Sequence, residues 1–304
     1  MKVSVIITTH NRPLQLQRAY DSVCNQTRIP EEIIIIDDAS DKIVADNLKN
    51  KSKNKPVTII KRFKTSQGAC KARNKGSAIA IGDIIMFLDD DDTWEPKKIS
   101  DQLNIFDSNP HIGIVYSGKL IVNETARTKI LYQVSPRAKG NLYPKILYDN
   151  LIGSTSSVAL KKKLFHQVGC FDEKMPALQD YDLWIRCCQK TLIGHDNSYN
   201  LRYTIAKNPH HQITGKSERQ IAAVKIILKK YQSEIANQGY INARKICAAK
   251  IFYIGKSLRY QSLLSAMPWI IKSFLQYPNL KVLALLLPLK TNQWLRKIFS
   301  SKLK

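Results

Sequence analysis

The sequence predicts an α/β fold with a mainly parallel central sheet flanked by helices, followed by a basic helical C-terminal extension. In the first hundred residues, short apolar runs typical of buried strands alternate with stretches that carry apolar residues at helical spacing. This alternation favours a parallel sheet covered by helices on both faces. Polar or acidic residues directly follow several of these runs, so candidate ligand residues gather at one edge of the sheet.

Each element has its own signal along the chain. Short apolar runs predict buried strands at residues 3–7, 33–36, 57–60, 84–88, 113–116 and 156–160. Asn11 and Pro13 predict a helix start, after which Leu16, Ala19 and Tyr20 recur at helical spacing. Further helices are predicted at residues 68–78 and 180–190.

Beyond residue 217 the sequence predicts helices. The apolar residues of the first one share a face: Ile221, Val224, Ile227, Leu228 and Tyr231. Residues 235–304 contain no Asp or Glu, whereas Lys and Arg recur throughout, with Trp269, Phe274, Trp294 and Phe299 among them. Such a segment either lies in the interface of an anionic membrane or packs as an extension whose basic residues are solvated.

Composition and charge limit the classes of protein. A chain of 304 residues with 44% hydrophobic content is globular and can bury a sizeable core. A net charge of +24 predicts attraction to a polyanion, such as nucleic acid, an anionic membrane face or a phosphorylated substrate. The cysteines are scattered without a two-residue-spaced pair, which disfavours a zinc or redox centre and indicates reduced thiols of a cytosolic protein. The apolar stretch at residues 3–7 is too short for a signal peptide, and no apolar run approaches the ~18 residues that cross a bilayer.

Residues 89–92 are four consecutive aspartates directly after an apolar strand. Like charges this close raise one another's pKa unless a cation compensates them. Mg²⁺ and Mn²⁺ take oxygen ligands and bridge carboxylates to a substrate diphosphate. The alternative is a solvated acidic loop that caps the helix starting near Glu95 and Pro96. A calcium loop is disfavoured, because its spacing would require other residues at Thr93 and Trp94.

Five blocks of sequence resemble the family 2 glycosyltransferases, whose catalytic domain has the GT-A fold that binds nucleotide sugars. The blocks are residues 3–12 (VSVIITTHNR), 32–40 (EIIIIDDAS), 68–76 (GACKARNKG), 82–92 (GDIIMFLDDDD) and 180–186 (DYDLWIR). They occur in the family's order over about two thirds of the chain. The resemblance implies an α/β fold of the GT-A type and transfer of a sugar from a nucleotide diphosphate.

The resemblance also implies which residues hold the nucleotide. Thr8 and Asn11 or Arg12 would lie along the base and ribose. Asp38 or Asp37 would accept the imide N–H of a uracil, since a carboxylate reads a donor on a pyrimidine edge. The alternative for both aspartates is a structural role in the turn after the strand.

The acidic run matches the family's metal motif, in which two acids flank a middle residue. The resemblance implies that Asp91 touches Mn²⁺ or Mg²⁺ and that Asp89 reaches the ribose or a metal-bound water, with Asp90 beside the donor and Asp92 as a further candidate ligand. Arg73 corresponds to a basic residue near the diphosphate, the alternative being a surface arginine. A metal here would offset charge on the diphosphate as it leaves.

By the same resemblance, Asp180 is the candidate catalytic base for the acceptor hydroxyl. Most members of the family have Glu before this position, whereas this chain has Gln179. Asp182 is then a helix-capping or supporting carboxylate, and Trp184 is better explained as a core residue. His210 and His211 are candidates for contact with the metal or diphosphate, the alternative being a surface position.

The resulting hypothesis is an inverting, metal-dependent glycosyltransferase of the hexosyltransferase class. Residues 1–215 would form the catalytic domain, with a nucleotide-binding half (1–92) and an acceptor half (93–215), and residues 216–304 the basic helical region. We expect a UDP-sugar donor, a glycan or lipid-linked acceptor in bacterial surface polysaccharide or lipooligosaccharide synthesis, and a cytoplasmic location with peripheral docking on the inner membrane. The alternatives are a catalytically impaired scaffold of the same fold, suggested by Gln179, and a nucleic-acid-binding protein, disfavoured because the strand-end acids would repel phosphates.

Overall fold

The structure, a computed structural model of the chain, describes residues 1–42, 48, 56–205, 217–259 and 261–287. The chain divides into two units. Unit 1 comprises Met1–Ile146, Asn150–Lys174 and Gln179–His211, and unit 2 comprises Leu147–Asp149, Met175–Leu178 and Gln212–Lys304. The predicted domain boundary at residue 215 lies outside the described residues.

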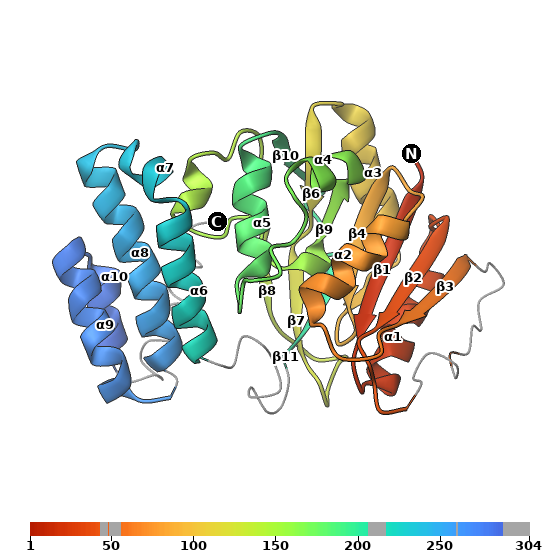
Figure 1. Cartoon of the computed structure of the whole chain (residues 1–304), viewed down its shortest axis with the longest axis horizontal. Coiled ribbons are helices and arrows are strands. Elements are labelled where there is room, and N and C mark those ends of the chain that lie inside the picture. Colours follow the sequence, from red (N-terminus) through yellow and green to blue (C-terminus); the bar gives the residue numbers. More distant parts are fainter. Residues whose placement is uncertain (43–47, 49–55, 206–216, 260, 288–304) are drawn as a thin grey trace. The chain divides into compact units, whose positions relative to one another are not determined.

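Unit 1 is built on strands and contains two sheets (Figure 1). Its strands are β1 (Val3–Thr9), β2 (Glu32–Asp37), β3 (Val57–Arg62), β4 (Ile84–Asp89), β5 (Thr93–Trp94), β6 (Ile112–Tyr116), β7 (Lys119–Asn123), β8 (Ile130–Val134), β9 (Val158–Lys161), β10 (Leu192–His195) and β11 (Leu201–Ile205). Its helices are α1 (Pro13–Cys24), α2 (Ala69–Ile79), α3 (Lys98–Ser108), α4 (Lys162–Gln167) and α5 (Gln179–Cys188), with short 3-10 turns η1 (Lys145–Leu147) and η2 (Thr155–Ser157).

The central sheet has the strand order β10-β6-β9-β4-β1-β2-β3. Strands β1 to β4 pair in parallel, as do β6 and β10. The predicted mainly parallel sheet with flanking helices is therefore confirmed, with one difference. Strand β9 runs antiparallel to both of its neighbours, β4 and β6, so the sheet is mixed.

Successive side chains of a strand point to opposite faces of the sheet, so both faces carry apolar side chains. Each face of this sheet is covered by different helices. Val3, Val5 and Ile7 of β1 are fully buried in one cluster with residues of α1 and α3. Ile6 points to the other face, where a Cβ on Gly76 of α2 would lie 2.5 Å from its Cγ2. Every β1 residue from Val3 to Ile7 is thus buried, which explains why the run is apolar apart from Ser4.

The sequence analysis did not predict the second sheet, of order β5-β11-β7-β8. Strand β11 pairs in parallel with β7 and antiparallel with β5. The two-residue strand β5 directly follows the acidic run, so this sheet begins where the run ends.

The register of the central sheet places the predicted site residues at one edge. Thr8 lies opposite Asp89, and Thr9 lies opposite Asp37, at the carboxyl ends of β1, β4 and β2. Parallel strands end at the same edge, which is where open α/β sheets bind ligands.

Unit 2 is helical and has a separate apolar core. Its helices are α6 (Ser217–Lys230), α7 (Gln232–Ala236), α8 (Tyr240–Arg259), α9 (Leu263–Gln276) and α10 (Leu280–Leu283), followed by a 3-10 turn, η5 (Ala284–Leu286). Val224 of α6 packs there with residues of α8, α9 and α10, as the predicted apolar face of this helix requires. Among the described residues, no helix is both long and apolar enough to cross a bilayer.

We predict that Gly82→Ala destabilises the protein, because the new Cβ would lie 2.5 Å from the backbone nitrogen of Ser4 and 2.7 Å from its hydroxyl. The hydroxyl of Ser4 also accepts the N–H of Gly82 and donates to Glu32 inside the sheet, so neither group can move freely. We expect a loss of about 1–3 kcal/mol in unfolding free energy, measured by urea denaturation.

The matched control is Gly255→Ala in α8, where the nearest atom would lie at an ordinary 3.4 Å. Alanine favours helix over glycine by about 1 kcal/mol, so this variant should be as stable as the wild type or more so. Equal denaturation midpoints for Gly82→Ala and the wild type would contradict the packing argument.

Candidate active site

The four aspartates after β4 alternate between open and buried positions. The side chains of Asp89 and Asp91 are 31% and 24% exposed, whereas that of Asp90 is 6% exposed and Asp92 is buried. The solvated acidic loop considered above would expose all four. The run instead presents two carboxylates outward and anchors the other two in the protein.

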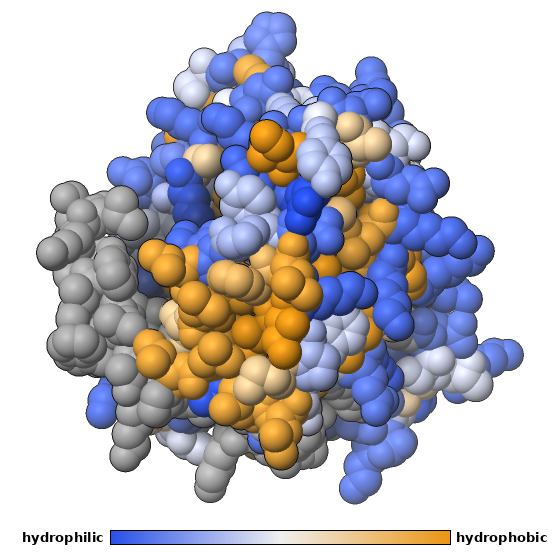
Figure 2. All heavy atoms as spheres, turned by 90° about the vertical axis from the view of Figure 1, so that its left-hand side faces the viewer, coloured by the Kyte–Doolittle hydropathy of each residue, from blue (hydrophilic) through white to orange (hydrophobic). Residues whose placement is uncertain are grey.

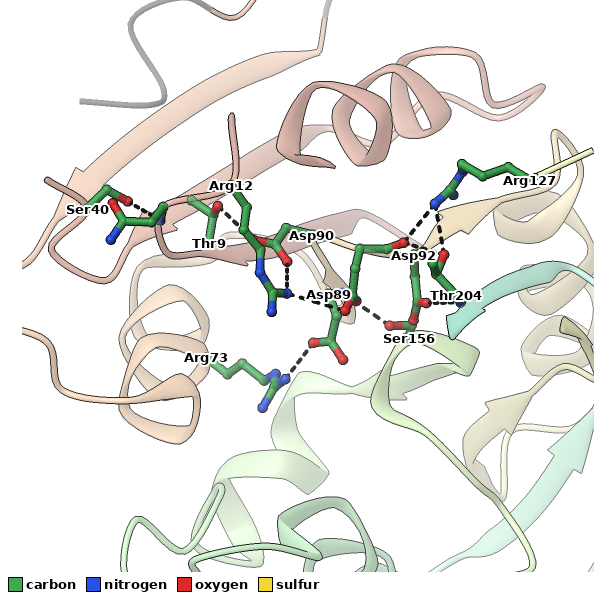
Figure 3. A network of polar contacts seen from close by, with 12 residues as sticks. Thr9, Arg12, Ser40, Arg73, Asp89, Asp90, Asp92, Arg127, Ser156 and Thr204 are labelled. Carbon is green, nitrogen blue, oxygen red and sulfur yellow. Dashed lines mark hydrogen bonds and ion pairs between the residues drawn. The ribbon is translucent and has the colours of Figure 1, made fainter. Parts of the chain in front are cut away.

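Two arginines offset the charge of the run (Figure 3). Nη1 of Arg12, at the N-cap of α1, lies 3.0 Å from Asp90 and 3.3 Å from Asp91. Nη2 of Arg73, in α2, lies 2.5 Å from Asp89, and this arginine is buried against the ring of Phe171. The cations that the aspartates need are thus partly supplied by the chain itself.

The buried pair is held by neutral donors as well. The hydroxyl of Thr9 donates to Asp90 over 2.8 Å, yet burial raises the pKa of Asp90 to about 6, with the charge of Arg12 acting against it. Asp92 accepts the backbone N–H of Thr204 from β11. Burial raises the pKa of Asp92 well above its ordinary range, and the nearby charges of Asp91 and Asp89 raise it further.

Arg127 fixes the far side of the run. Its Nη1 donates to the carbonyl of Asp91 and to the hydroxyl of Thr204, and its Nη2 donates to Thr93. Figure 3 shows Arg127 and Thr204 on the opposite side of the run from Arg12 and Arg73. Arg127 and Thr204 were missed by the sequence analysis, since neither lies in a block that resembles the family.

The two aspartates after β2 have different surroundings. Asp37 accepts the N–H and hydroxyl of Ser40 three residues later, which is the turn role considered for it. Asp38 accepts the backbone N–H groups of Gln67 and Gly68, at the start of α2, over 2.6 and 2.9 Å. Both carboxylates are buried and already hydrogen-bonded, so a base edge would have to share their remaining acceptor capacity.

The β1–α1 loop is fastened to the loop after β2. The N–H of Asn11 donates to Ser40, and the side-chain oxygen of Asn11 accepts the N–H of Asp41. Asn11 adopts a positive φ of 56°, which asparagine tolerates better than most residues. Thr8 is partly exposed at the strand end. The candidate base- and ribose-binding residues therefore line one edge, together with the acidic run.

Asp180 lies in the first turn of α5 and is half-buried. Burial raises its pKa, and the charge of Asp89 adds to the rise, while the N–H of Tyr181 and the charges of Lys119 and Arg73 act against it. Asp180 is therefore within electrostatic reach of both Asp89 and Arg73. The fold brings together residues that lie about ninety positions apart in the sequence.

Lys119, at the start of β7, is a further site residue that the sequence analysis missed. Its ammonium lies 5.3 Å from the ring centre of Tyr203, and a Cβ on Gly153 would lie 2.9 Å from it. Burial lowers the pKa of Lys119, whereas the charges of Asp180 and Asp92 raise it. No sequence signal distinguishes this lysine, because its surroundings arise from the pairing of β7 with β11.

The remaining candidates of the α5 block have structural surroundings. Trp184 is fully buried and donates to the carbonyl of Gly153, in agreement with a core role. Asp182 is buried and pairs with Arg186 one turn later. Gln179 is half-buried at the first position of the helix. His210 and His211 lie outside the described residues.

The oxygen donors of the acidic run decide whether it can hold Mg²⁺ or Mn²⁺. The part of the chain that the structure describes contains no group of three or more His, Cys, Asp or Glu residues arranged to hold a metal ion. Asp89 and Asp91 nevertheless offer partly exposed carboxylates. Mg²⁺ is commonly bound through one or two carboxylates together with substrate phosphates. The residues therefore fit an ion that binds together with a diphosphate, and they do not form a complete protein cage.

Comparison with known proteins places this site in a family. The family model described as "Glycosyl transferase family 2" matches residues 4–169, which is more than half of the chain. An uncharacterized glycosyltransferase of Haemophilus influenzae is 32% identical over 191 residues, which cover 62% of this chain and 62% of that protein. For a relative from Nostoc sp. the shares are 55% and 53%, so the match spans less than two thirds of these relatives.

Solved structures show the fold. The crystal structure of residues 1–349 of S. aureus TarS has a TM-score of 0.63 and 19% identity, and the match covers 94% of this chain and 83% of that one. A crystal structure of the same protein in complex with UDP-GlcNAc has a TM-score of 0.58 and 15% identity, covering 93% and 90%. From the extent of the family match, with the acidic run at the strand edge, we conclude that the chain belongs to glycosyl transferase family 2.

Proposed function

We propose that the chain transfers a sugar from a UDP-linked donor to a hydroxyl group of a glycan or lipid-linked acceptor, with inversion at the anomeric carbon. The observation that carries this proposal is the convergence of Asp180, Asp89 and Arg73 at one strand edge in a member of this family. A base, an open carboxylate and a buried cation are the groups that displacement of a nucleotide diphosphate requires.

The choice of UDP rests on a structural neighbour and on the strand-end residues. TarS, whose fold is similar, has been crystallised with UDP-GlcNAc. In this chain, the carboxylate of Asp38 and the loop of Asn11 lie at the carboxyl edge of the central sheet, and a uracil N–H can share a carboxylate oxygen. A UDP-sugar is therefore the first donor to test, with UDP-GlcNAc as the probe.

Arg73 is the group best placed to meet the diphosphate. It pairs with Asp89 through Nη2, while its buried Nε has no hydrogen-bond partner among the described residues. A buried donor without an acceptor is costly, so an incoming phosphate oxygen would satisfy it. Mg²⁺ or Mn²⁺, when bound by Asp91 and Asp89, would supply positive charge to offset the charge of the departing UDP.

Asp180 is proposed as the base. The acceptor oxygen forms a bond to the anomeric carbon while the bond to the β-phosphate oxygen breaks, UDP leaves with the electron pair, and the hydroxyl proton passes to Asp180. Burial raises the pKa of Asp180 and so strengthens it as a base. The charges of Lys119 and Arg73 act against that rise, because a nearby cation favours the ionised carboxylate.

The test of the proposal is release of UDP from UDP-GlcNAc by the full chain, with and without Mn²⁺ or Mg²⁺. Slow hydrolysis by water is expected even without the acceptor, and it should depend on the metal. UDP binding without any turnover of several UDP-sugars would instead favour the impaired scaffold that Gln179 suggests. We further propose that the acceptor belongs to bacterial surface-polysaccharide or lipooligosaccharide synthesis, on the basis of family resemblance alone.

We predict that Asp180→Asn lowers the rate of sugar transfer by at least ~100-fold and leaves UDP affinity nearly unchanged, because an amide cannot accept the proton. Single-turnover transfer and calorimetric titration with UDP measure the two effects. Asp182→Asn, in the same helix, is the control. It should lower the unfolding free energy because the ion pair with Arg186 is lost, without a comparable loss of transfer rate at saturating substrate. Equal transfer rates for Asp180→Asn and the wild type would exclude Asp180 as the base.

We predict that Asp91→Asn abolishes the metal dependence of UDP binding, because one of the two open carboxylates is lost. Isothermal titration with UDP, with and without Mn²⁺, measures this. The exposed Asp107→Asn is the control for a general change of charge and should behave as the wild type. An unchanged response to Mn²⁺ in Asp91→Asn would argue against the metal assignment.

We predict the opposite kind of effect for the neighbouring Asp92→Asn. Its carboxylate is buried and its pKa is raised in the folded state, so ionisation costs stability at neutral pH. The wild type should therefore lose stability as pH rises through this folded-state pKa, and an uncharged Asn that still accepts from Thr204 should not. In urea denaturation we expect Asp92→Asn to be more stable than the wild type at pH 8, with a difference that shrinks toward pH 5. A less stable Asp92→Asn at pH 8 would contradict this.

A further inference from the structure

The outer surface of α9 and α10 in unit 2 exposes large aliphatic side chains. Leu264 and Leu275 of α9 are 83% and 69% exposed, Ile271 between them is 51% exposed, and Leu280 of α10 is 83% exposed. Figure 2 shows a continuous hydrophobic area where these helices face the viewer. We call the surface formed by Leu264, Ile271, Leu275, Leu280 and Leu283 the α9–α10 face.

Packing within unit 2 does not explain this face. The inner side of α9 is already used, since Ala266, Ile270 and Ser273 are buried, with Ser273 donating to α8. Leu264, Ile271 and Leu275 recur at intervals of seven and four and lie on the other side of the same helix. A helix that is apolar on both sides needs a second apolar environment. Surface patches of this kind mark contacts with proteins or membranes.

The charge around the face is of one sign. Lys272 and Lys281 are exposed on α9 and α10 themselves. Arg244 donates to the carbonyls of Leu275 and Gln276 at the C-terminal end of α9, and Arg259 donates to the carbonyl of Leu285 in the turn after α10. Residues 235–304 contain no acidic residue that could neutralise these cations.

We propose that the α9–α10 face docks on the surface of an anionic lipid bilayer, with its leucines and isoleucine in the interface and its basic residues against the headgroups. Apolar side chains surrounded by Lys and Arg are the arrangement by which helices lie in an anionic membrane surface without crossing it. The proposal does not depend on sugar transfer.

Charge complementarity selects this occupant over two others. A second copy of the chain would bring one basic rim against another, which repels. The C-terminal residues 288–304 carry Lys290, Arg296, Lys297, Lys302 and Lys304 and no acid, so they repel the rim in the same way. Anionic headgroups are the one occupant of the three with the opposite charge.

The docking residues differ from those that the sequence suggested. Trp269 and Phe274 are aromatic residues of the segment that the sequence offered for the membrane interface, but both pack against the apolar core of unit 2. Trp294 and Phe299 lie outside the described residues. The exposed residues are aliphatic. Aliphatic side chains insert below the headgroups, whereas aromatic side chains lie at headgroup level.

The test is flotation of the full chain with vesicles of phosphatidylcholine, with and without phosphatidylglycerol. The wild type should float with the anionic vesicles and stay at the bottom with neutral vesicles. High salt should partly release it, because the Debye length falls to ~3 Å at 1 M salt. Leu264→Ser/Ile271→Ser/Leu275→Ser should reduce partitioning by at least ~10-fold with an unchanged melting temperature. Ile81→Ser/Val57→Ser, which changes exposed apolar residues of unit 1, is the matched control and should float as the wild type.

A charge variant keeps the proposal testable if the triple variant fails to fold. Lys272→Gln/Lys281→Gln should weaken binding to anionic vesicles by about 25-fold, since each basic residue near the surface contributes about fivefold. The proposal is overturned if the wild type fails to float with anionic vesicles, or if the triple variant floats as well as the wild type. A wild-type dimer in sedimentation that the triple variant dissociates, without vesicle binding, would assign the face to a second copy.

Discussion

Four carboxylates in succession repel one another, and the candidate site consists largely of the groups that offset this repulsion. Arg12 reaches the run from the N-cap of α1, and Arg73 reaches it from α2, so two elements that follow different strands are drawn to the end of a third. The alternation of open and buried aspartates then follows, because Thr9 and Thr204 hold the buried pair. The remaining open carboxylates and the incompletely bonded Arg73 give a surface that favours a ligand carrying both phosphate and a cation.

The second sheet contributes to this arrangement, although its strands come after residues 1–92, the predicted nucleotide-binding half. Strand β11 supplies Thr204, whose N–H and hydroxyl both contact the acidic run, and β7 supplies Lys119 beside Asp180. Because β7 and β11 are paired, the position of the supporting threonine and that of the lysine are set together. Lys119, which affects the pKa of the proposed base Asp180, and Thr204, which holds the acidic run, are therefore linked through one strand pair.

The sequence predicted the features that depend on local pattern. The strands of the parallel half and the apolar face of α6 follow from periodicity, and the strand-end acids are visible as charges after apolar runs. The second sheet, the direction of β9 and the role of Lys119 depend on contacts between distant residues, which no local pattern records. The pairing of Arg12 and Arg73 with the acidic run was missed for the same reason. Because of this pairing, the four aspartates need less charge from a bound cation than their number suggests. On α9, the buried Ile270 and the exposed Ile271 are the same residue type, so only the structure separates them.

The insertion of β9 between β4 and β6 has a consequence for how the protein is made. Strand β4 is the last strand of the first ninety residues, yet one of its edges is completed by residues 158–161, synthesised some seventy positions later. During translation, the first ninety residues therefore emerge from the ribosome before β9 can pair with residues 84–86, and unpaired apolar strand edges invite association with other chains. The acid-rich end of that same strand carries a charge that opposes edge-to-edge pairing, so the residues that form the site in the finished protein also protect the unfinished one.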